Sequence, residues 1–284
     1  MQLSIIVITK NHSERLEATI ASAAGAAPWA ELVLVCDGGQ IFECVTTWAK
    51  QSFDNYAAVT LTGQGRAAAR NAGANAASGD QFVFLDGDMV FSPTSLAELA
   101  AQGTRGPTLR RGAVLELLGA ALAQDLSVGG SGFPPMHIPD LQANGFFPGG
   151  YRCAQSVLEQ AVTRRFVDGE RHIPDWIAAS GAFFAIDANL WRDLGGQNEG
   201  FGTTWGCEDL EFSYRAIASG ALIDYRPAAI GYHLSHLQPD RWISHAGALT
   251  HFEEATGDAS VRTLQDLLAV DGSVARYVAA LERR

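Results

Sequence analysis

The sequence predicts an α/β fold in which a central, mostly parallel β-sheet is flanked by helices. Two observations lead to this prediction. Short apolar segments alternate with helix-forming segments through the first ninety residues, and polar residues follow directly after several of the apolar segments. The first pattern is typical of βαβ units, and the second is typical of a ligand cleft at the carboxyl ends of parallel strands. With 284 residues, the chain is long enough for one large domain or two small ones.

The first half of the chain supplies the regular part of this pattern. Strands are predicted at residues 3–9, 31–36, 57–61 and 81–86, and helices at residues 13–24, 41–50 and 65–77. Leu16 and Ile20 recur at helical spacing in the first of these helices, and Ser13 is a suitable N-cap. The polar residues that follow the strands, and that we expect to converge on one cleft, are Thr9, Asn11, Asp37, Asp86 and Asp88.

The second half of the chain is less regular. Residues 92–127 are predicted to be helical with a break at 104–108, and residues 129–150 form a loop rich in glycine, proline and aromatic residues. Loops of that length are commonly functional, so we look there for acceptor contacts, with ordinary loop packing as the alternative. The aromatic residues concerned are Phe133, Phe146, Phe147 and Tyr151. Strands are predicted at 181–187 and 221–225, and helices at 208–220 and 259–283, the last one broken near 271–272.

The composition excludes several classes of protein. The formal net charge is −11 and no run of Lys or Arg occurs, which argues against binding to nucleic acid or to anionic membrane surfaces. The four cysteines show no CxxC spacing, as expected of reduced thiols in a cytosolic protein. No apolar run approaches the roughly 20 residues that cross a bilayer, and no signal peptide is evident. We therefore expect a soluble, cytoplasmic protein.

The segment FLDGDM, residues 84–89, places two carboxylates at the end of a predicted buried strand. Side chains at positions i and i+2 of an extended segment point to the same side, so Asp86 and Asp88 would repel each other unless a positive charge lies between them. A divalent cation such as Mn²⁺ or Mg²⁺, shared with a diphosphate, meets this need. Gly87 would allow a ligand to approach the backbone closely. The alternative is a simple Asp-Gly turn.

The segment WGCEDLEF, residues 205–212, contains three acids within four positions. Glu208 and Asp209 would lie in the first turn of a helix, where the helix dipole favours acids, so a capping role is the simpler interpretation. Against it, Trp205 and Gly206 precede the acids at the end of a glycine-rich segment, 195–206. A flexible loop that leads to an indole and then to carboxylates is a reasonable acceptor site, in which one carboxylate acts as a general base.

Two further groups of residues allow both a functional and a structural interpretation. His233 and His236 could ligate Mn²⁺, although a single histidine is more often structural. Arg66 and Arg70 share one helix face and could bind phosphates, or they could form a solvated face. No Walker A loop, GxGxxG fingerprint or GxSxG elbow occurs in the sequence.

Taken in order, four segments of the sequence resemble those of GT-A fold glycosyltransferases, namely inverting family 2 and its galactosyltransferase-like relatives. They are SIIVITKNHSERLEATIASA, VLVCDGG, GRAAARNAGANAASGDQFVFLDGDM and SGAFFAIDANLWRDLGGQNEGFGTTWGCEDLEFSYRAIASG. In the second segment, Cys36 replaces the first Asp of the family's Asp-Asp-Gly-Ser motif. The resemblance implies a GT-A domain at residues 1–258, followed by a C-terminal helical region at 259–284.

The resemblance also implies a nucleotide-sugar site within residues 1–91. It implies a metal site formed by one residue of this range and by a histidine near the end of the acceptor half. The nucleotide-sugar site would consist of Thr9, Asn11, Asp37, Arg70, Asp86 and Gly87, with Asp37 on the base and Arg70 near the base or the diphosphate. Asp88 and His233 would ligate Mn²⁺ or Mg²⁺, with His236 as the alternative ligand.

The acceptor half implied by the resemblance is residues 175–236. Asp209 matches the catalytic base of inverting enzymes, Glu208 would orient the acceptor or the donor sugar, and Trp205 and Gly206 would bind the acceptor. Retaining N-acetylgalactosaminyltransferases that share this segment carry Asn where Asp209 stands, so we expect inversion of the anomeric centre.

The function that we expect is a metal-dependent, inverting transfer from a nucleotide sugar, with UDP as the expected nucleotide, to the hydroxyl of an unidentified acceptor. A small molecule, a glycan, a lipid-linked sugar or a protein could be that acceptor. One alternative is a non-catalytic protein that binds nucleotide sugar or glycan on a degenerate transferase fold. Another is a nucleotidyltransferase, which would normally carry a glycine-rich loop after the first strand.

Overall fold

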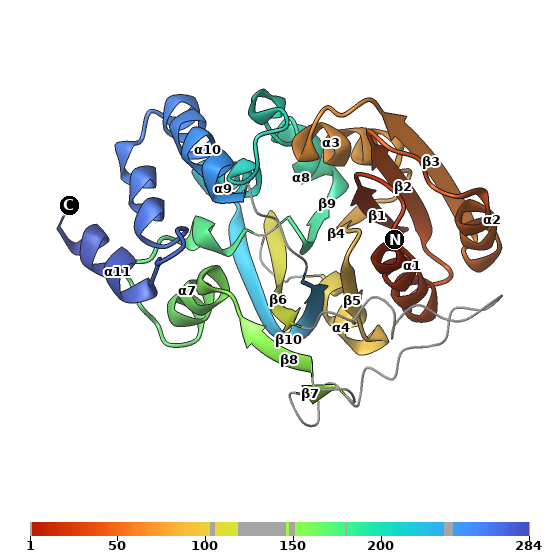
Figure 1. Ribbon diagram of the computed structural model, residues 1–284, viewed down its shortest axis with the longest axis horizontal. Helices are drawn as coiled ribbons and strands as arrows, with labels where there is room; N and C mark the ends of the chain where they lie inside the picture. The colour runs from red at the N-terminus through yellow and green to blue at the C-terminus, as the bar shows by residue number, and fades with distance from the viewer. Residues whose placement is uncertain are drawn as a thin grey trace.

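The computed structural model describes residues 2–102, 106–118, 146–147, 151–179, 181–235 and 241–283. Its centre is a mixed β-sheet with helices on both faces (Figure 1). The described strands follow the order β3-β2-β1-β4-β9-β6-β10-β5, and β8 and β7 are added beside β6. The predicted α/β class is therefore confirmed.

The parallel half of the sheet comes from the first ninety residues, as predicted. It contains β1 (Leu3–Thr9), β2 (Glu31–Asp37), β3 (Asn55–Leu61) and β4 (Gln81–Asp86). Strands β1, β2 and β4 are buried along almost their whole length, which is why their sequences are continuous apolar runs. In the register, Thr9 lies opposite Cys36 and Ile8 lies opposite Asp86, so the carboxyl ends of these three strands are level with one another.

The other half of the sheet is joined largely by antiparallel pairing. Its strands are β5 (Met89–Phe91), β6 (Thr108–Leu118), β7 (Phe146–Phe147), β8 (Tyr151–Gln155), β9 (Phe183–Asp187) and β10 (Leu222–Leu234). The strand predicted at 221–225 is therefore much longer, and β5 was not predicted. The pairing of β5 with β10 sets Met89 opposite His233, which brings the segment just before β5 to the same place.

The prediction of a helix after the break at 104–108 is wrong for residues 109–118, because they belong to β6, and residues 119–127 lie outside the described residues. The segment contains Leu, Arg, Ala and Glu, all good helix formers, so the local propensity favours the other element. Burial in the sheet decides against it. Arg110 and Arg111 are each about 1% exposed and form ion pairs with Asp187 and Glu159, which an exposed helix would not provide.

The helices divide between the two faces of the sheet. On one face lie α1 (Glu14–Ala26), α2 (Glu43–Ser52) and α4 (Pro93–Ala100), and on the other lie α3 (Arg66–Ala76), α8 (Ala188–Asp193) and α9 (Glu208–Ala218). Ser13 caps α1 as predicted, because its Oγ accepts from the Leu16 N–H at 3.2 Å. Helix α3 lies directly on β1, since a Cβ at Gly73 would come within 2.4 Å of the Ile6 side chain.

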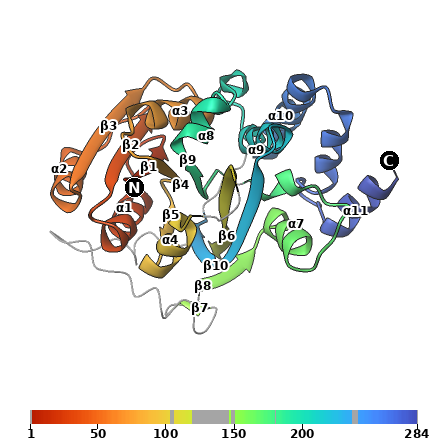
Figure 2. The same ribbon diagram turned by 180° about the vertical axis from the view of Figure 1, so that it is seen from behind.

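Elements from the second half of the chain form a separate hydrophobic cluster beside the sheet. These elements are α7 (Val157–Phe166), η1 (Asp175–Ala178), α10 (Arg241–Thr256), η3 (Ala259–Asp266) and α11 (Val274–Glu282). In both views α10 and α11 lie at the end of the molecule opposite to β3 and α2 (Figures 1 and 2). The helical region predicted at 259–283 is present, with its break between η3 and α11. Among the described helices, none has both the length and the apolar composition to cross a bilayer.

Two glycine-to-alanine variants test how tightly the sheet is packed. A Cβ at Gly112 in β6 would lie 2.5 Å from the Ala229 carbonyl oxygen and from the Phe183 ring, so we expect Gly112→Ala to lower the free energy of unfolding by about 2 kcal/mol. The matched control is Gly25→Ala in α1, where nothing lies within 4 Å, and we expect about 0.5 kcal/mol of stabilisation. Urea unfolding measures both changes. Equal free energies of unfolding for the two variants would contradict the close packing around Gly112.

Candidate active site

A cavity of about 790 Å³ opens where the carboxyl ends of β1, β2 and β4 meet. The predicted site residues that line it are Thr9, Asn11, Asp37, Asp86, Gly87, Asp88 and Trp205. The five polar residues that were expected to converge on one cleft therefore do so. Of the other predicted site residues, Arg70, Gly206, Glu208, Asp209 and His233 are not part of the cavity lining.

Asp37 shapes the loop before α3. Its Oδ1 accepts hydrogen bonds from the N–H groups of Gly63 and Gln64 at 2.8 and 2.7 Å, and its Oδ2 accepts from the Gly65 N–H at 2.6 Å. The prediction placed Asp37 on the base of a nucleotide. In the structure the carboxylate stands at the cavity wall with three of its roughly four acceptor positions already used, which leaves one for a ligand.

Arg70 lies beneath the cavity and joins two carboxylates from distant parts of the chain. Its side chain is 1% exposed, its Nη2 is 2.9 Å from Asp86 Oδ1, and its Nη1 is 3.2 Å from Glu208 Oε1. The sequence placed Arg70 near the base or the diphosphate. The structure places it against Asp86, at the end of β4, and Glu208, at the start of α9. The space for the guanidinium is left by Gly181, where a Cβ would come within 2.1 Å of Nη2.

Asp88 has a cationic partner of its own. His233 Nε2 is 3.1 Å from Asp88 Oδ2, and His233 Nδ1 is 2.7 Å from Glu116 Oε2. Burial works against a charged imidazole, but Asp88 and Glu116 outweigh it and raise the pKa of His233 well above its ordinary value. Pairing in the sheet brings the three residues together, because His233 of β10 lies opposite both Met89 of β5 and Glu116 of β6.

The pair Asp88 and His233 suits a small divalent cation. Two ligand atoms about 2.1 Å from one ion in octahedral geometry lie about 3 Å apart, close to the separation of Asp88 Oδ2 and His233 Nε2. Glu116 behind His233 is the arrangement that orients a metal-binding imidazole in many proteins. Within the described residues no group of three or more His, Cys, Asp or Glu side chains forms a complete metal site, so further ligands would come from substrate oxygens and water.

Glu208 and Asp209 begin helix α9 after a strained residue. Cys207 has a φ of 68°, the only positive φ of a non-glycine residue in the described part of the chain, and this turn sets where the helix starts. Asp209 is partly accessible and accepts from the Gly181 N–H at 2.7 Å and the Leu210 N–H at 2.9 Å. Its burial and then the neighbouring Glu208 raise its pKa to about 6, while Arg70 and the two N–H groups act in the opposite direction.

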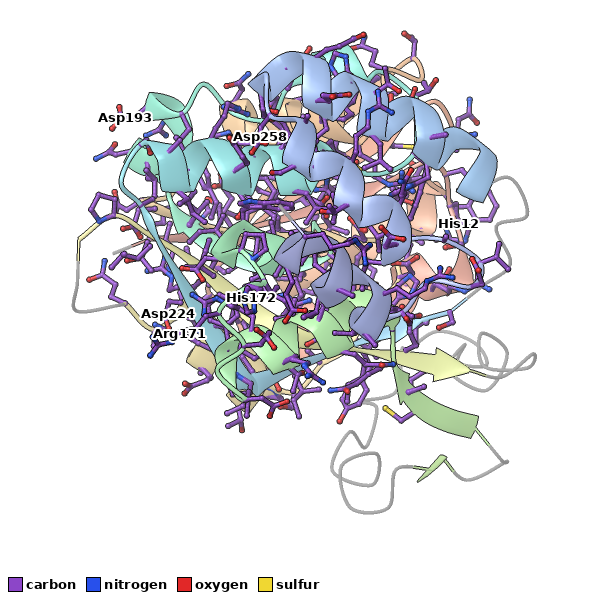
Figure 3. The ribbon with its side chains drawn as sticks, turned by 90° about the vertical axis from the view of Figure 1, so that its left-hand side faces the viewer. His12, Arg171, His172, Asp193, Asp224 and Asp258 are labelled. Atoms are coloured by element: carbon purple, nitrogen blue, oxygen red, sulfur yellow. The ribbon has the colours of Figure 1, made fainter. Side chains whose placement is uncertain are left out.

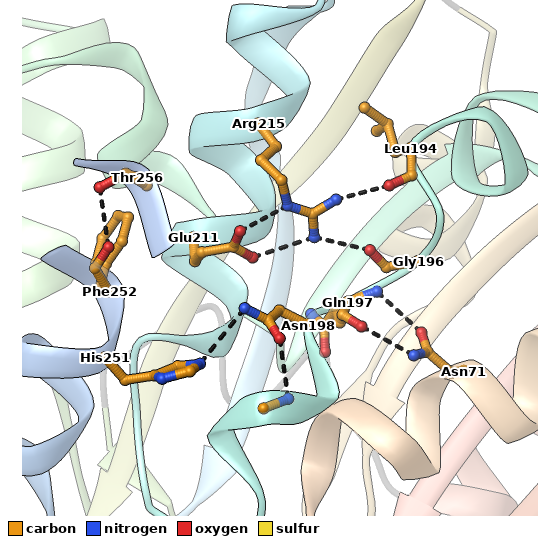
Figure 4. A network of polar contacts seen from close by, with 11 residues as sticks. Asn71, Leu194, Gly196, Gln197, Asn198, Glu211, Arg215, His251, Phe252 and Thr256 are labelled. Atoms are coloured by element: carbon orange, nitrogen blue, oxygen red, sulfur yellow. Dashed lines mark hydrogen bonds and ion pairs between the residues drawn. The ribbon is translucent and has the colours of Figure 1, made fainter. Parts of the chain in front are cut away.

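Residues 194–198, at the start of the glycine-rich segment, are held by side chains from three helices (Figure 4). Asn71 of α3 exchanges two hydrogen bonds of 2.9 Å with the backbone of Gln197. Arg215 of α9 donates to the Leu194 and Gly196 carbonyls at 2.6 and 2.8 Å. Nε2 of His251 in α10 lies 3.4 Å from Nδ2 of Asn198.

Trp205 and Gly206 connect this segment to α9. The Trp205 ring lines the cavity, and the guanidinium of Arg66 lies 5.8 Å from its centroid. Gly206 has a φ of 97°, and a Cβ there would come within 3.2 Å of the His245 ring, so glycine suits both the backbone and the space. Which of these residues contacts an acceptor stays a prediction.

Two other regions give less information. A smaller hollow of about 550 Å³ is lined by residues 164 and 168–172. Figure 3 shows Arg171, from this hollow, on the left of the view and His12, which follows the cavity residue Asn11, on the right. His236 and residues 129–145 lie outside the described residues, as do the side chains of Phe146, Phe147 and Tyr151.

The sequence did not single out three residues that hold the site together, namely Glu116, Gly181 and Gln197. Glu116 was detectable in principle, as a lone charge in the apolar run AVLELL. Gly181 and Gln197 left no signal, because their roles depend on where Arg70 ends after the chain has folded.

The contribution of Arg70 can be measured by comparing two arginines one helical turn apart. Arg70→Met leaves Asp86 and Glu208 without their cation, and we expect a loss of about 3 to 5 kcal/mol in the free energy of unfolding at pH 7.5. Arg66→Met is the control, since Arg66 has no ion pair among the described residues and contacts the Trp205 ring, so its loss should stay below about 1 kcal/mol. Urea unfolding that gave equal losses would contradict the role of Arg70.

Residues 4–108 match the model of the family described as glycosyl transferase family 2. A search of the curated proteins gave no match.

Three solved structures illustrate the likeness of the fold. They are GalNAc-T7 with UDP, GalNAc and Mn²⁺ (TM-score 0.60, 15% identity, 99% of this chain and 54% of that one), the mannosyltransferase PcManGT of Pyrobaculum calidifontis with GDP-Man and Mn²⁺ (0.59, 14%, 99% and 68%) and S. aureus TarS (0.55, 15%, 100% and 43%). The chain spans about half the length of the GalNAc-T7 structure. The chain shares the fold of these glycosyltransferase structures, and its residues 4–108 match the glycosyl transferase family 2 model.

Proposed function

We propose that the protein is a metal-dependent, inverting glycosyltransferase that moves a sugar from a nucleotide diphosphate sugar to an acceptor hydroxyl. The observation that carries the proposal is the pair of ion pairs made by Arg70. Its guanidinium contacts Asp86 in the cavity and Glu208 at the start of α9, directly before Asp209. A site for a charged donor and a carboxylate of raised pKa are thereby held side by side, as a transfer reaction requires.

The donor would occupy the cavity at the ends of β1, β2 and β4. Arg66 lines this cavity and has no carboxylate partner among the described residues, whereas Asp86 and Asp88 already have Arg70 and His233. A diphosphate would therefore find an available cation there. We propose UDP as the nucleotide, as in the GalNAc-T7 structure, although the Pyrobaculum structure contains GDP-Man.

Asp88 and His233 would hold the divalent cation, and His233 would give up its proton on binding it. Mn²⁺ is the ion present in two of the similar structures, and Mg²⁺ is the alternative. When bound, such an ion stabilises the negative charge that develops on a departing nucleoside diphosphate. The protein contributes the carboxylate, the imidazole and the orienting Glu116.

Asp209 would act as the general base. A carboxylate with a pKa of about 6 is mostly ionised at neutral pH and is a better proton acceptor than an ordinary aspartate. The two backbone N–H groups of Gly181 and Leu210 orient it. Direct attack by the activated hydroxyl, with no covalent intermediate, inverts the anomeric centre. Trp205 and Gly206, four and three residues before this carboxylate in the chain, are the proposed acceptor contacts.

Donor binding is tested by a thermal-shift panel of UDP, GDP, TDP and CDP sugars, with and without Mn²⁺ or Mg²⁺. A ligand that binds only the native state raises Tm, by an amount set by its concentration relative to Kd. We expect a metal-dependent rise with a UDP sugar that is lost in Asp88→Ala and kept in Asp54→Ala, an exposed acid away from the cavity. No rise with any donor would contradict the proposal.

Catalysis by Asp209 is tested with Asp209→Asn, which keeps the shape of the side chain and removes the base. We expect kcat to fall by about 10² to 10⁴-fold while the donor-induced rise in Tm remains. The anomeric configuration of the wild-type product, read by proton NMR early in the reaction, should be opposite to that of the donor. Unchanged turnover in the variant would remove Asp209 from this role, and a retained configuration would exclude inversion.

A further inference from the structure

Gln197 lies in the segment between β9 and α9 and is fixed from two directions. Its backbone forms two hydrogen bonds of 2.9 Å with the side chain of Asn71 in α3. Its side chain contacts Arg70, the residue before Asn71 in α3. The residue is 2% exposed. Consecutive residues of α3 thus hold both the backbone and the side chain of one residue, and this places the Gln197 amide with little freedom.

The side chain of Gln197 makes one polar contact among the described residues, and that contact is with Arg70. Gln197 Oε1 accepts from Arg70 Nη1 at 3.2 Å, the same nitrogen that donates to Glu208 Oε1 at 3.2 Å. Gln197 Nε2 is buried and has no hydrogen-bond partner in this part of the structure. A buried amide nitrogen without a hydrogen-bond partner destabilises the folded protein. The hydrogen bond between Oε1 and Arg70 is therefore the favourable polar interaction of this side chain.

The charge around Arg70 explains why the acceptor at this position is neutral. One guanidinium faces Asp86 from β4 and Glu208 from α9, and it also lowers the pKa of Asp209. Three carboxylates already outnumber the single cation. An amide oxygen satisfies the second hydrogen of Nη1 without adding a fourth negative charge, whereas a carboxylate would compete with Glu208 and Asp209 for the same cation.

We propose that Gln197 is a positioning residue of the transfer reaction, which acts through Arg70: as a neutral acceptor on Nη1 it holds the guanidinium between Asp86 and Glu208 and so sets the charge environment of Asp209. This inference rests on the proposed function, in which Asp209 is the base. The groups that face Asp209 are Glu208 and the neutral thiol of Cys207 from its own segment, Arg70 from α3, and the N–H groups of Gly181 and Leu210.

Gln197→Glu is a sharp test, because it changes charge with little else. The two side chains have the same shape, and since Nε2 has no partner, an oxygen in its place breaks no hydrogen bond. The added charge should weaken the hold of Arg70 on Asp209 and move the titration of Asp209 to higher pH. Gln197→Met keeps the size and removes the acceptor, and Gln51→Glu on the exposed surface of α2 is the matched control for the added charge.

The measurement that does not require turnover is the titration of Asp209 by carbon NMR of protein labelled at the aspartate carboxyl, with the signal assigned by its loss in Asp209→Asn. We expect a midpoint of about 6 in the wild type and in Gln51→Glu, and a midpoint higher by at least about half a pH unit in Gln197→Glu. An equal midpoint in folded Gln197→Glu would overturn the inference.

Turnover gives the second measurement. The acidic limb of kcat/KM should move with the NMR midpoint in Gln197→Glu, and Gln197→Met should lower kcat by about tenfold or more while the donor KM stays within about twofold. If Gln197→Glu does not fold, a kcat of Gln197→Met within twofold of wild type overturns the inference. If no protein turns over but the NMR midpoint still shifts, the proposed function fails while the coupling of Gln197 to Asp209 stands.

Discussion

The buried guanidinium of Arg70 is the interaction on which the rest of the site depends. It is 1% exposed and lies between a carboxylate at the end of β4 and another at the start of α9. A charge at such a depth is tolerated only when it is paired, and removal of either partner leaves the other uncompensated. The positions of α3, β4 and α9 are therefore tied to one another through one side chain. Two glycines make this possible, because Gly73 lets α3 approach β1 and Gly181 leaves space for the guanidinium.

The pairing of charges also explains how two carboxylates can stand two residues apart at a strand end. Asp86 is paired with Arg70 and Asp88 is paired with His233, so each acid has its own cation. The sequence interpretation placed a metal ion between the two acids as the reason why they tolerate each other. The structure supplies a further reason, because each of the two acids contacts a cationic side chain of the protein itself. The partner of Asp88 is also the replaceable one, since an imidazole loses its proton when a metal binds, whereas a guanidinium does not.

The parts of this architecture that could be predicted from the sequence are those fixed by local pattern. The strands β1, β2 and β4 are continuous apolar runs, and their polar ends meet because parallel strands end at one edge. The parts that could not be predicted depend on contacts across the chain. β6 has the local preferences of a helix, and only its place in the sheet with Arg110 and Arg111 buried decides otherwise. Similarly, Arg66 and Arg70 look equivalent in sequence, but the first lines the cavity and the second lies beneath it.

In the mechanism that we propose, the arrangement around Asp209 lowers the stability of the fold and makes Asp209 a better proton acceptor. The folded protein raises the pKa of this group from its ordinary value of 3.8 to about 6, so the folded state binds its proton more tightly than the unfolded state does. By linkage, stability falls as the pH rises from about 4 to 6, and above that range the loss is complete, on the order of 2 to 3 kcal/mol. A stronger hold by Arg70 would recover this free energy but would also make Asp209 a weaker base. Arg70 is a single cation shared among three carboxylates and one neutral amide, so its hold on Asp209 is limited. Asp209 is therefore ionised at neutral pH and still basic enough to accept a proton.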